Sequence, residues 1–280
     1  MLLVHFSKDA ELRLSDFNDV FWGKTIILAG ASPSLNEENK ELLNKRGVLS
    51  MAMNNAAIHF QPTLWCSGDA PHCYDPQILM DPRIIKFAPF AHFNTKLEDG
   101  SFYFKCPNIH FYYQKLNVFW ADFFNVRKEV PWYHNTFFTS INLLYNLGIR
   151  RIVLVGSDFG AKVDKELYAH PTVLSDKERA WNTLLYDYIV DEMKALKPIF
   201  DDNGLEILDA SRYSRLSPEY TKISLEEGVD LCLSGFPDKR DSRTLPHCAK
   251  ILDNLGNGDL SELKKRAWDK PYENSQQTLI

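Results

Sequence analysis

Residues 24–37, KTIILAGASPSLNE, join a run of apolar residues to a turn of very small side chains. Residues 25–29 (TIILA) predict a buried strand, because a short continuous apolar run bounded by glycine is typical of strands inside parallel sheets. The turn at residues 30–34 (GASPS) is either a plain connection to a helix or a contact for a phosphate. The second interpretation rests on the unpaired N–H groups and the positive dipole end at the start of a helix.

A helix and two more strands are expected after the turn. Ser34 and Glu37 have the spacing of a capping box, and the helix is expected to end at NKRG, where glycine follows basic residues. Residues 48–53 and 64–67 read as the second and third strands. Three strands with a helix between the first two indicate a parallel sheet.

The regular pattern stops between residues 70 and 135, where aromatic residues are concentrated and RIIKFAPF and NIHFYY are short strand candidates. We expect this segment to form an irregular, aromatic-rich insertion or lid over the sheet. Regularity returns with a helix in TFFTSINLLYNLG, a strand in RRIVLVG, a long helix capped by Ser175 or Asp176, and a last strand in LEILDAS. Pro198 is expected to kink the long helix or to end its regular part.

These elements predict an α/β fold with a Rossmann-like, doubly wound and mostly parallel sheet. One domain would span residues 1–235, with the insertion at about residues 70–135, and a chain of 280 residues is long enough for it. Residues 236–280 would form a polar, helical C-terminal extension. We expect this extension either to dock on the domain or to mediate assembly into a homo-oligomer.

The composition is that of an ordinary globular protein, 45% hydrophobic and 25% charged. The net charge of -5 argues against a broad nucleic-acid-binding surface. No apolar run has the length of a membrane span, and the N-terminus becomes charged too early for a signal peptide. The five cysteines form no CxxC pair, which favours free thiols and a reducing compartment. We therefore expect a cytoplasmic protein without membrane contact.

Polar residues stand at the predicted ends of five strands. In a doubly wound sheet, ligands bind beyond the carboxyl ends of the strands, so these residues are expected to meet at one edge. Small hydroxyls, amides and carboxylates suit the ribose, phosphates and polar base of a nucleotide. Taken singly, each residue also has a structural explanation as a turn or cap. The candidates for nucleotide binding are Gly30, Ala31, Ser32, Ser34, Asn54, Asn55, Asp69, Thr136 and Ser157, with Asp158, Asp209, Ser211 and Arg212 at the same edge.

Common nucleotide-binding and hydrolase motifs do not occur. The turn GASPS is neither GxGxxG nor a P-loop, and the chain contains no GxSxG elbow. His170, in the loop ELYAHPT, is the histidine best placed to act as an acid or base, and His134 is second. Each is equally well explained as an exposed loop residue. Arg212 is expected either to clamp a phosphate or to pair with surface acids.

Two blocks, ILAGASPSL and TSINLLYNLGIRRIVLVGSDF, resemble motifs of the bacterial sialyltransferases first found in Campylobacter. They are also similar to blocks of the archaeal-type 6-hydroxymethylpterin diphosphokinase-like proteins (DUF115) and of uncharacterised phage proteins. The likeness to the phage proteins is closer, since MNNAA, DPRI and SRL match as well. The resemblance covers residues 24–70 and 134–216, and a phage origin would place the protein in the host cytoplasm.

The likeness to sialyltransferases implies a CMP-type nucleotide-sugar donor and no tightly bound cofactor. Residues 30–32 would lie against the cytidine nucleotide and Asn54 would hydrogen-bond it. Thr136 would face the base or ribose, and Tyr168 would bind the leaving phosphate. The family's second phosphate-binding tyrosine corresponds to Gly160, and its catalytic histidine has no match in this chain.

The family's turn also has Asn and Gly where this chain has Ala31 and Ser32. The likeness to diphosphokinases implies ATP with Mg²⁺, which Asp69 and Asp158 would hold. We predict a nucleotide-dependent transferase, a sialyltransferase-like glycosyltransferase that acts on a small hydroxyl-bearing acceptor. His170 would be the substitute base, with Asp158 as a second catalytic candidate. The alternatives are a metal-dependent diphosphokinase and a non-catalytic nucleotide-binding accessory protein.

Overall fold

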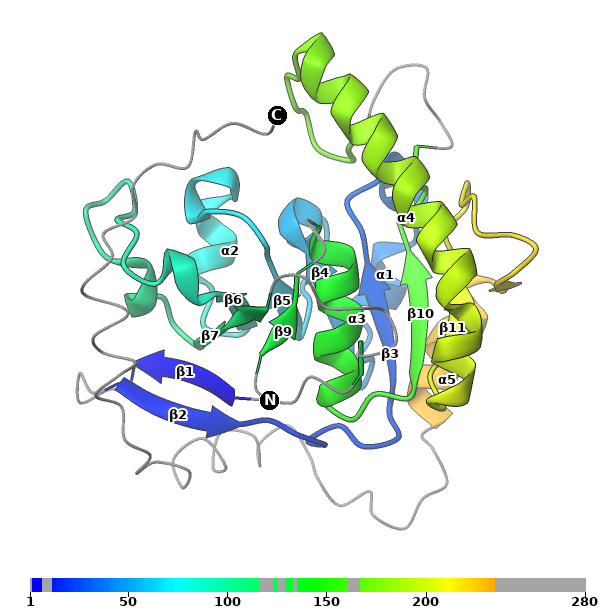
Figure 1. Ribbon diagram of the computed structural model, residues 1–280, viewed down its shortest axis with the longest axis horizontal. Helices are drawn as coiled ribbons and strands as arrows, with labels where there is room; N and C mark the ends of the chain where they lie inside the picture. Colours follow the sequence, from blue (N-terminus) through cyan, green and yellow to red (C-terminus); the bar gives the residue numbers. More distant parts are fainter. Residues whose placement is uncertain are drawn as a thin grey trace.

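The computed structural model describes residues 2–6, 12–115, 123–124, 129–132, 135–160 and 167–234. Figure 1 shows a central sheet with helices packed on both sides of it. His134 and the C-terminal extension expected over residues 236–280 lie outside the described residues.

A sheet of ten strands forms the centre, in the order β12-β11-β10-β3-β4-β5-β6-β7-β1-β2. Every pairing from β12 to β7 is parallel, and β1 and β2 add an antiparallel hairpin at one edge. The mostly parallel sheet predicted from the sequence is therefore confirmed. Its strands are β1 (Leu2–Phe6), β2 (Leu12–Asp16), β3 (Thr25–Ala29), β4 (Ser50–Met53), β5 (Leu64–Cys66), β6 (Ile85–Pro89), β7 (Ile109–Tyr112), β10 (Arg151–Val155), β11 (Glu206–Asp209) and β12 (Thr221–Lys222). Strands β8 (Gln114–Lys115) and β9 (Val130–Pro131) pair separately.

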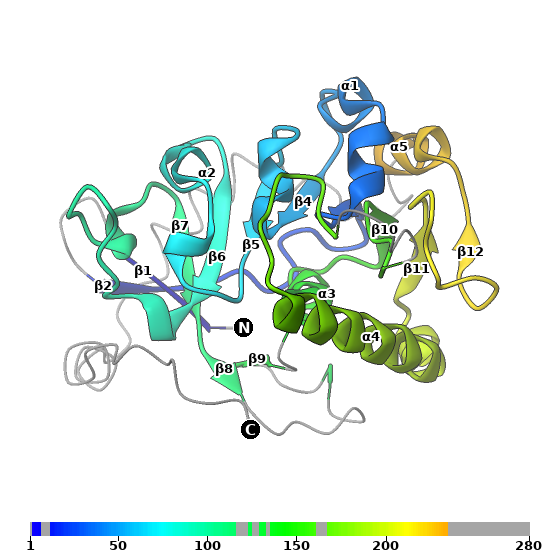
Figure 2. The ribbon, with the colours of Figure 1, turned by 90° about the horizontal axis from the view of Figure 1, so that it is seen from above.

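Helices cover both faces of this sheet, which confirms the doubly wound arrangement. Helices α3 and α4 lie on one face and α1 and α5 on the other, as the two views in Figures 1 and 2 show. The helices are α1 (Lys40–Leu43), α2 (Pro76–Met80), α3 (Thr136–Asn146), α4 (Asp176–Asp202) and α5 (Leu225–Ser234).

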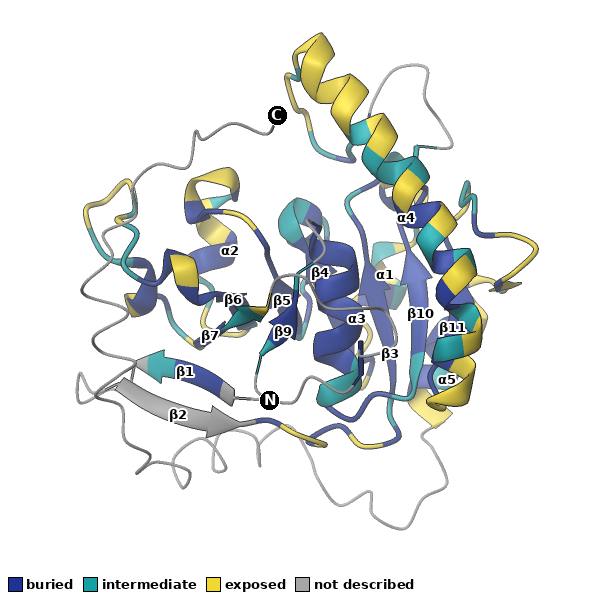
Figure 3. Cartoon of the chain, in the orientation of Figure 1, coloured by how far each residue is buried: buried dark blue, intermediate teal, exposed yellow. Residues whose placement is uncertain are grey.

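Side chains of the central strands alternate between two hydrophobic cores. In β3, Ile26 and Leu28 belong to the core that contains residues of α3 and α4. Ile27 and Ala29 belong to the core that contains residues of α1 and α5. Because both faces are covered, the strand reads as a continuous apolar run in the sequence. Figure 3 shows this burial in the sheet, in contrast to the exposed N-terminal turns of α4.

The order of the strands reverses at β3. From β3 the sheet grows through β4 to β7 in one direction, and β10, β11 and β12 then extend it on the other side. In doubly wound folds, the crevice beyond the carboxyl ends of the strands at such a reversal is where ligands bind. The carboxyl ends of β3 and β10 are therefore the first place to look for a site.

The capping box expected at Ser34 does not form. Pro33–Glu37 is a short 3-10 helix that starts after Ser32, and the four-residue α1 is capped by the side chain of Asn39, which accepts a hydrogen bond from the Glu41 N–H. Ser34 is completely buried and its hydroxyl is used by a buried carboxylate instead. Neither helix is long enough to offer the extended helix start that the phosphate interpretation assumed.

The segment at residues 70–135 differs from the expected insertion in one important respect. Its strands β6 and β7 pair in parallel with β5 and with each other, so they extend the main sheet rather than lie over it. Both strands lie inside the sheet, and β1 pairs with the outer edge of β7. The irregular aromatic part lies between them, where Phe93 stacks on Phe104 with a centroid distance of 4.8 Å.

The second half of the chain follows the sequence pattern closely. Helix α3 ends just before Gly148, which has a left-handed φ of +95°. Helix α4 is capped by Ser175, one of the two predicted caps, which forms a capping box with Glu178, and it continues through Pro198 to Asp202, so Pro198 does not end it. Strand β12, after the expected last strand, was not predicted. Among the described residues, no helix is both long and apolar enough to cross a membrane.

Candidate functional site

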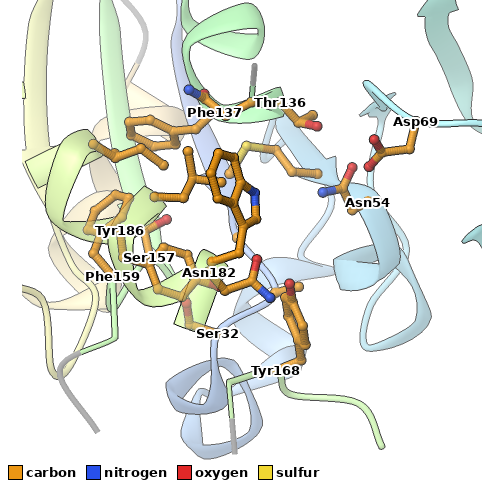
Figure 4. A pocket seen from close by; sticks show the side chains of 18 of the residues that line it. Ser32, Asn54, Asp69, Thr136, Phe137, Ser157, Phe159, Tyr168, Asn182 and Tyr186 are labelled. Atoms are coloured by element: carbon orange, nitrogen blue, oxygen red, sulfur yellow. The ribbon is translucent and has the colours of Figure 1, made fainter. Parts of the chain in front are cut away.

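A pocket of about 290 Å³ opens beyond the carboxyl ends of β3, β4, β5 and β10. The start of α3 and the inner face of α4 close it from the side (Figure 4). It lies at the reversal of strand order, as the fold predicts. The residues that line it are Gly30, Ala31, Ser32, Met53, Asn54, Asp69, Trp132, Asn135, Thr136, Phe137, Gly156, Ser157, Phe159, Tyr168, Trp181, Asn182, Leu185, Tyr186 and Ile189.

The structure brings many of the predicted site residues together in this pocket and leaves others outside it. Those in the lining are Gly30, Ala31, Ser32, Asn54, Asp69, Thr136, Ser157 and Tyr168. Those outside the lining are Ser34, Asn55, Asp158, His170, Asp209, Ser211 and Arg212.

Two glycines make the floor of the pocket at the ends of β3 and β10. The Gly30 N–H donates to the Val155 carbonyl at 2.8 Å, and the Ser32 N–H donates to the Gly156 carbonyl at 3.0 Å. A Cβ on Gly30 would lie 2.5 Å from the Gly156 carbonyl oxygen, so no side chain fits between the two strand ends. Close backbone packing therefore explains Gly30 without a phosphate, while Ala31 and Ser32 still face the pocket.

Asp158 connects the segments that follow β3 and β10 through hydrogen bonds outside the pocket lining. Its Oδ1 accepts from the Ser34 hydroxyl at 2.5 Å and its Oδ2 accepts from the Ser34 N–H at 2.9 Å. The Asp158 N–H donates to the Ser32 hydroxyl at 3.2 Å. Burial raises the pKa of the Asp158 carboxyl, and the hydrogen bonds from Ser34 act in the opposite direction. Both Asp158 oxygens are engaged by Ser34 and Asp158 lies outside the lining, so its contacts are structural, and the predicted catalytic and metal-binding role stays a prediction.

Asn54 and Asp69 form one polar wall of the pocket, held from behind by Tyr74. Asn54 has a left-handed φ of +51°, and its carbonyl accepts from the Trp65 indole N–H at 2.7 Å. The Tyr74 hydroxyl accepts from the Asp69 N–H at 3.0 Å and lies 3.3 Å from both Asn54 Oδ1 and Asp69 Oδ2. Figure 4 shows the Asn54 and Asp69 side chains directed toward each other at this wall.

The surroundings of Asp69 shift the pKa of its carboxyl group. Burial raises the pKa of the Asp69 carboxyl, while the hydrogen bond from Tyr74 and the nearby His72 lower it. Asp69 is the only carboxylate, and Lys, Arg and His are missing, among the described residues that line the pocket. The described lining residues could hold a phosphate through N–H groups and hydroxyls.

The opposite wall is aromatic and comes largely from α4. Trp181, Asn182, Leu185, Tyr186 and Ile189 follow the spacing of one helix face. The sequence analysis missed these residues. The apolar positions at helical spacing between residues 181 and 189, with Asn182 among them, could have indicated a helix face that lines a site. Figure 4 shows Tyr186 beside Phe159 on this side and Asn182 beside Tyr168.

Tyr168 and Tyr186 present a pair of hydroxyls. Burial raises the pKa of the Tyr168 phenol, and hydrogen bonds with the Tyr186 and Asn182 side chains lower it. Burial also holds the pKa of Tyr186 far above the usual value of a tyrosine, so its hydroxyl stays protonated at neutral pH. The pair is therefore a source of hydrogen-bond donors inside the pocket.

The start of α3 supplies the remaining polar groups. The Asn135 side chain caps the helix by accepting from the Phe138 N–H at 2.9 Å, and Thr136 lines the pocket directly. A Cβ on Gly68 would lie 2.6 Å from the Trp132 ring and 2.9 Å from the Thr136 hydroxyl oxygen. Gly68 is thus required for Trp132 and Thr136 to reach the pocket.

The predicted residues outside the lining have other contacts. The His170 ring stacks on Tyr168 with a centroid distance of 5.4 Å, and its Nε2 lies 3.5 Å from the Asn55 amide nitrogen. Burial lowers the pKa of His170. Asn55 donates to the Cys73 carbonyl and accepts from the Asp75 N–H, so it shapes a turn.

Arg212 lies on the surface, where it pairs with Glu37 at 3.4 Å and Glu38 at 3.8 Å. The structure thus supports the surface-pair interpretation of Arg212 rather than the phosphate clamp. In the part of the chain that the structure describes, no group of three or more His, Cys, Asp or Glu residues is arranged to hold a metal ion. Asp69 and Asp158 do not share the pocket.

No protein-family model matches this chain, and no curated protein matches its sequence. Among solved structures, the chain is similar to the sialyltransferase CstII of Campylobacter jejuni, which was solved in complex with a substrate analogue, cytidine-5′-monophosphate. The TM-score is 0.43 and the identity 14%, over 73% of this chain and 86% of that one.

Proposed function

We propose that this protein is a nucleotide-dependent transferase that moves a sugar from a CMP-type donor to the hydroxyl of a small acceptor. The observation that carries the proposal is the pocket itself, which lies at the reversal of strand order and combines a glycine floor, an aromatic wall and a hydroxyl and amide wall. The motifs at residues 24–70 and 134–216 that resemble sialyltransferases give independent support.

The size and lining of the pocket favour a mononucleotide. Its volume of about 290 Å³ is at the small end for ligand pockets, which favours one nucleotide with its attached group over a dinucleotide. Flat rings such as Phe159 and Trp181 can stack on a base, and the Asn54 amide can hydrogen-bond it or the ribose.

The leaving phosphate would be stabilised by fixed hydrogen-bond donors. The donors of the described lining residues include the Tyr168 and Tyr186 hydroxyls and the first N–H groups of α3, at Thr136 and Phe137. Donors held in place before the reaction stabilise charge that develops in the transition state, and they need no metal to do so. His170 receives no support as the base, since its ring lies behind Tyr168 rather than in the lining.

The diphosphokinase alternative has no observation in its favour. Transfer of a pyrophosphate from ATP needs carboxylates that hold a divalent metal near the triphosphate. Of the two predicted ligands, Asp69 faces the pocket and Asp158 has both oxygens bonded to Ser34 behind it.

A thermal-shift panel of CMP, CDP, UDP, GDP, ADP and ATP, each with and without Mg²⁺, tests the proposal. We expect CMP and CDP to raise the melting temperature without metal, because a ligand that binds only the folded state stabilises it. Asn54→Ala, in the pocket, should reduce the shift, while Asn55→Ala, its neighbour outside the lining, should keep it. A shift with ATP only in the presence of Mg²⁺ would favour the diphosphokinase, and no shift at all would refute a nucleotide site. Binding without turnover of CMP-sialic acid would identify an accessory protein.

A further inference from the structure

We propose that Asp69 is the general base of the transferase, the group that takes the proton from the acceptor hydroxyl. The proposal rests on the transferase function put forward above, and it assigns the role for which the motif resemblance offers no histidine. It follows from the position of one carboxylate in the pocket and from the way its neighbours leave one oxygen available.

Asp69 is the acid that faces the pocket. It is the only carboxylate in the lining that the described residues form, and none of the described histidines lines the pocket. Figure 4 shows its carboxylate directed into the pocket beside the Asn54 amide. A base must lie within hydrogen-bonding reach of the proton that it removes, and among the described lining residues Asp69 alone combines that position with proton-accepting chemistry.

Tyr74 holds the carboxylate in place. The Tyr74 hydroxyl lies 3.3 Å from Asp69 Oδ2 and accepts from the Asp69 N–H at 3.0 Å, so both the backbone and one oxygen of Asp69 are fixed. Asp69 Oδ1 has no hydrogen-bond partner among the described residues. One oxygen is thus oriented by the protein, and the other remains free to accept a proton. A positioned general base is expected to have one oxygen held by the protein and one oxygen available to the substrate.

Tyr74 also lines a second cavity, of about 340 Å³. The Tyr74 ring lines it together with Leu79, Met80 and Lys96, while the Tyr74 hydroxyl reaches Asp69. Tyr74 therefore connects the Asp69 carboxylate to a cavity that is lined by apolar side chains and by a few charged ones.

The chemical step balances without any further reactant. The acceptor oxygen attacks the anomeric carbon of the donor sugar and forms the new C–O bond, while its proton passes to Asp69. The bond between the anomeric carbon and the phosphate oxygen breaks, and its electron pair leaves with the nucleotide. Asp69 then releases the proton to solvent, and neither oxidant nor metal is consumed.

Asp69→Asn and Asp69→Ala test the assignment, with CMP-sialic acid as donor and lactose as acceptor probe, and with donor hydrolysis followed in parallel. We expect both variants to bind CMP about as tightly as the wild type, and to lower kcat by roughly 100-fold or more, which is the usual contribution of a general base. Formate supplied to Asp69→Ala should restore turnover by about tenfold, because it returns a carboxylate to the vacated space. Asp75→Asn, an identical change at the half-buried N-cap of α2, should leave kcat unchanged.

The outcomes separate this assignment from the proposed function. A wild-type protein that binds no nucleotide overturns the proposed function, and the assignment with it. If CMP binds and the donor is consumed but Asp69→Asn keeps kcat within about threefold, Asp69 is not the base although the transferase stands. Weaker CMP binding with unchanged kcat would make Asp69 a nucleotide-binding residue. Binding of CMP without any donor consumption by the wild type also overturns the assignment.

Discussion

Gly30 and Gly156 lie in direct backbone contact, so that a Cβ on either would approach the other's carbonyl oxygen to 2.5 Å or 2.7 Å. The first glycine directly follows β3 and the second directly follows β10, two strands that are neighbours in the sheet but separated by more than a hundred residues in the chain. This contact sets the floor of the pocket and brings Ser32 and Ser157 to the same edge.

Gly30→Ala should destabilise the protein by about 1–3 kcal/mol, because the added methyl group meets a backbone carbonyl that cannot rotate away. Urea denaturation measures the loss. Gly204→Ala is the control, since a Cβ there meets nothing within 4 Å and only the left-handed φ of +68° costs stability. We expect Gly30→Ala also to lose the CMP-induced thermal shift and Gly204→Ala to keep it. If Gly30→Ala unfolded at the same urea concentration as the wild type, the two strand ends would be shown to separate freely.

Asp158→Ala should cost about 2–4 kcal/mol, because it leaves the buried Ser34 N–H and hydroxyl without their acceptor. Asp187→Ala is the matched control. Its carboxylate pairs with Arg215 at 2.7 Å on the surface, where such a pair contributes less than about 1 kcal/mol. Equal losses in the two variants, measured by chemical denaturation, would contradict a structural role for the buried contact. A double-mutant cycle with Ser34→Ala should show strong coupling.

Stability should fall as the pH is lowered below 6.5, because of the buried His110. Burial, with His5 and Lys86 nearby, lowers the pKa of His110 from 6.5 to about 3. Between pH 6.5 and about 3, the unfolded chain therefore binds a proton at this histidine that the folded protein does not bind. The contribution of His110 to the free energy of unfolding is complete above pH 6.5 and is lost as the pH falls. Between pH 7 and pH 5 the loss for this one residue is about 2 kcal/mol.

His110→Phe keeps the ring that packs against Phe17 and should flatten this part of the pH dependence of the unfolding free energy. The exposed His72 provides the control, and His72→Asn should behave as the wild type does. An unchanged slope in His110→Phe would assign the acid sensitivity to other groups.

Tyr186→Phe should weaken CMP binding roughly tenfold, because it removes one hydroxyl donor from the pocket and leaves the ring. Isothermal titration calorimetry gives the affinity directly. Tyr213→Phe also removes one hydroxyl, which donates to Glu37 at 2.7 Å outside the lining, and it should bind CMP as the wild type does. The same affinity in both variants would mean that the Tyr186 hydroxyl contacts no phosphate.

His170→Ala should reduce turnover only modestly, by about fivefold, because the ring supports Tyr168 by stacking, an interaction that contributes roughly 1 kcal/mol. Steady-state kinetics with CMP-sialic acid would show the effect. A loss of about 100-fold, comparable to that expected for Asp69→Asn, would return His170 to the role of base.

Much of the fold could be predicted because the relevant signals are local. The continuous apolar runs of β3 and β10 arise from burial on both faces, and the capping box at Ser175 depends on residues three positions apart. Strands β6 and β7 were recognised as short strands but expected outside the sheet. Nothing in their local sequence shows that β7 pairs with the distant β1, since that pairing is made by residues far apart in the chain.

The sequence by itself determined that polar residues follow successive buried strands, and hence the edge at which a site would lie. Which of those residues face one another was decided by tertiary structure. Ser34 and Asp158, 124 positions apart, bond to each other behind the pocket, whereas Asp69 faces into it. The aromatic wall also depends on where α4 crosses the strand ends. Local sequence governs backbone conformation and burial through short-range contacts, but a site is made by side chains from distant segments that only the packed fold brings within hydrogen-bonding distance.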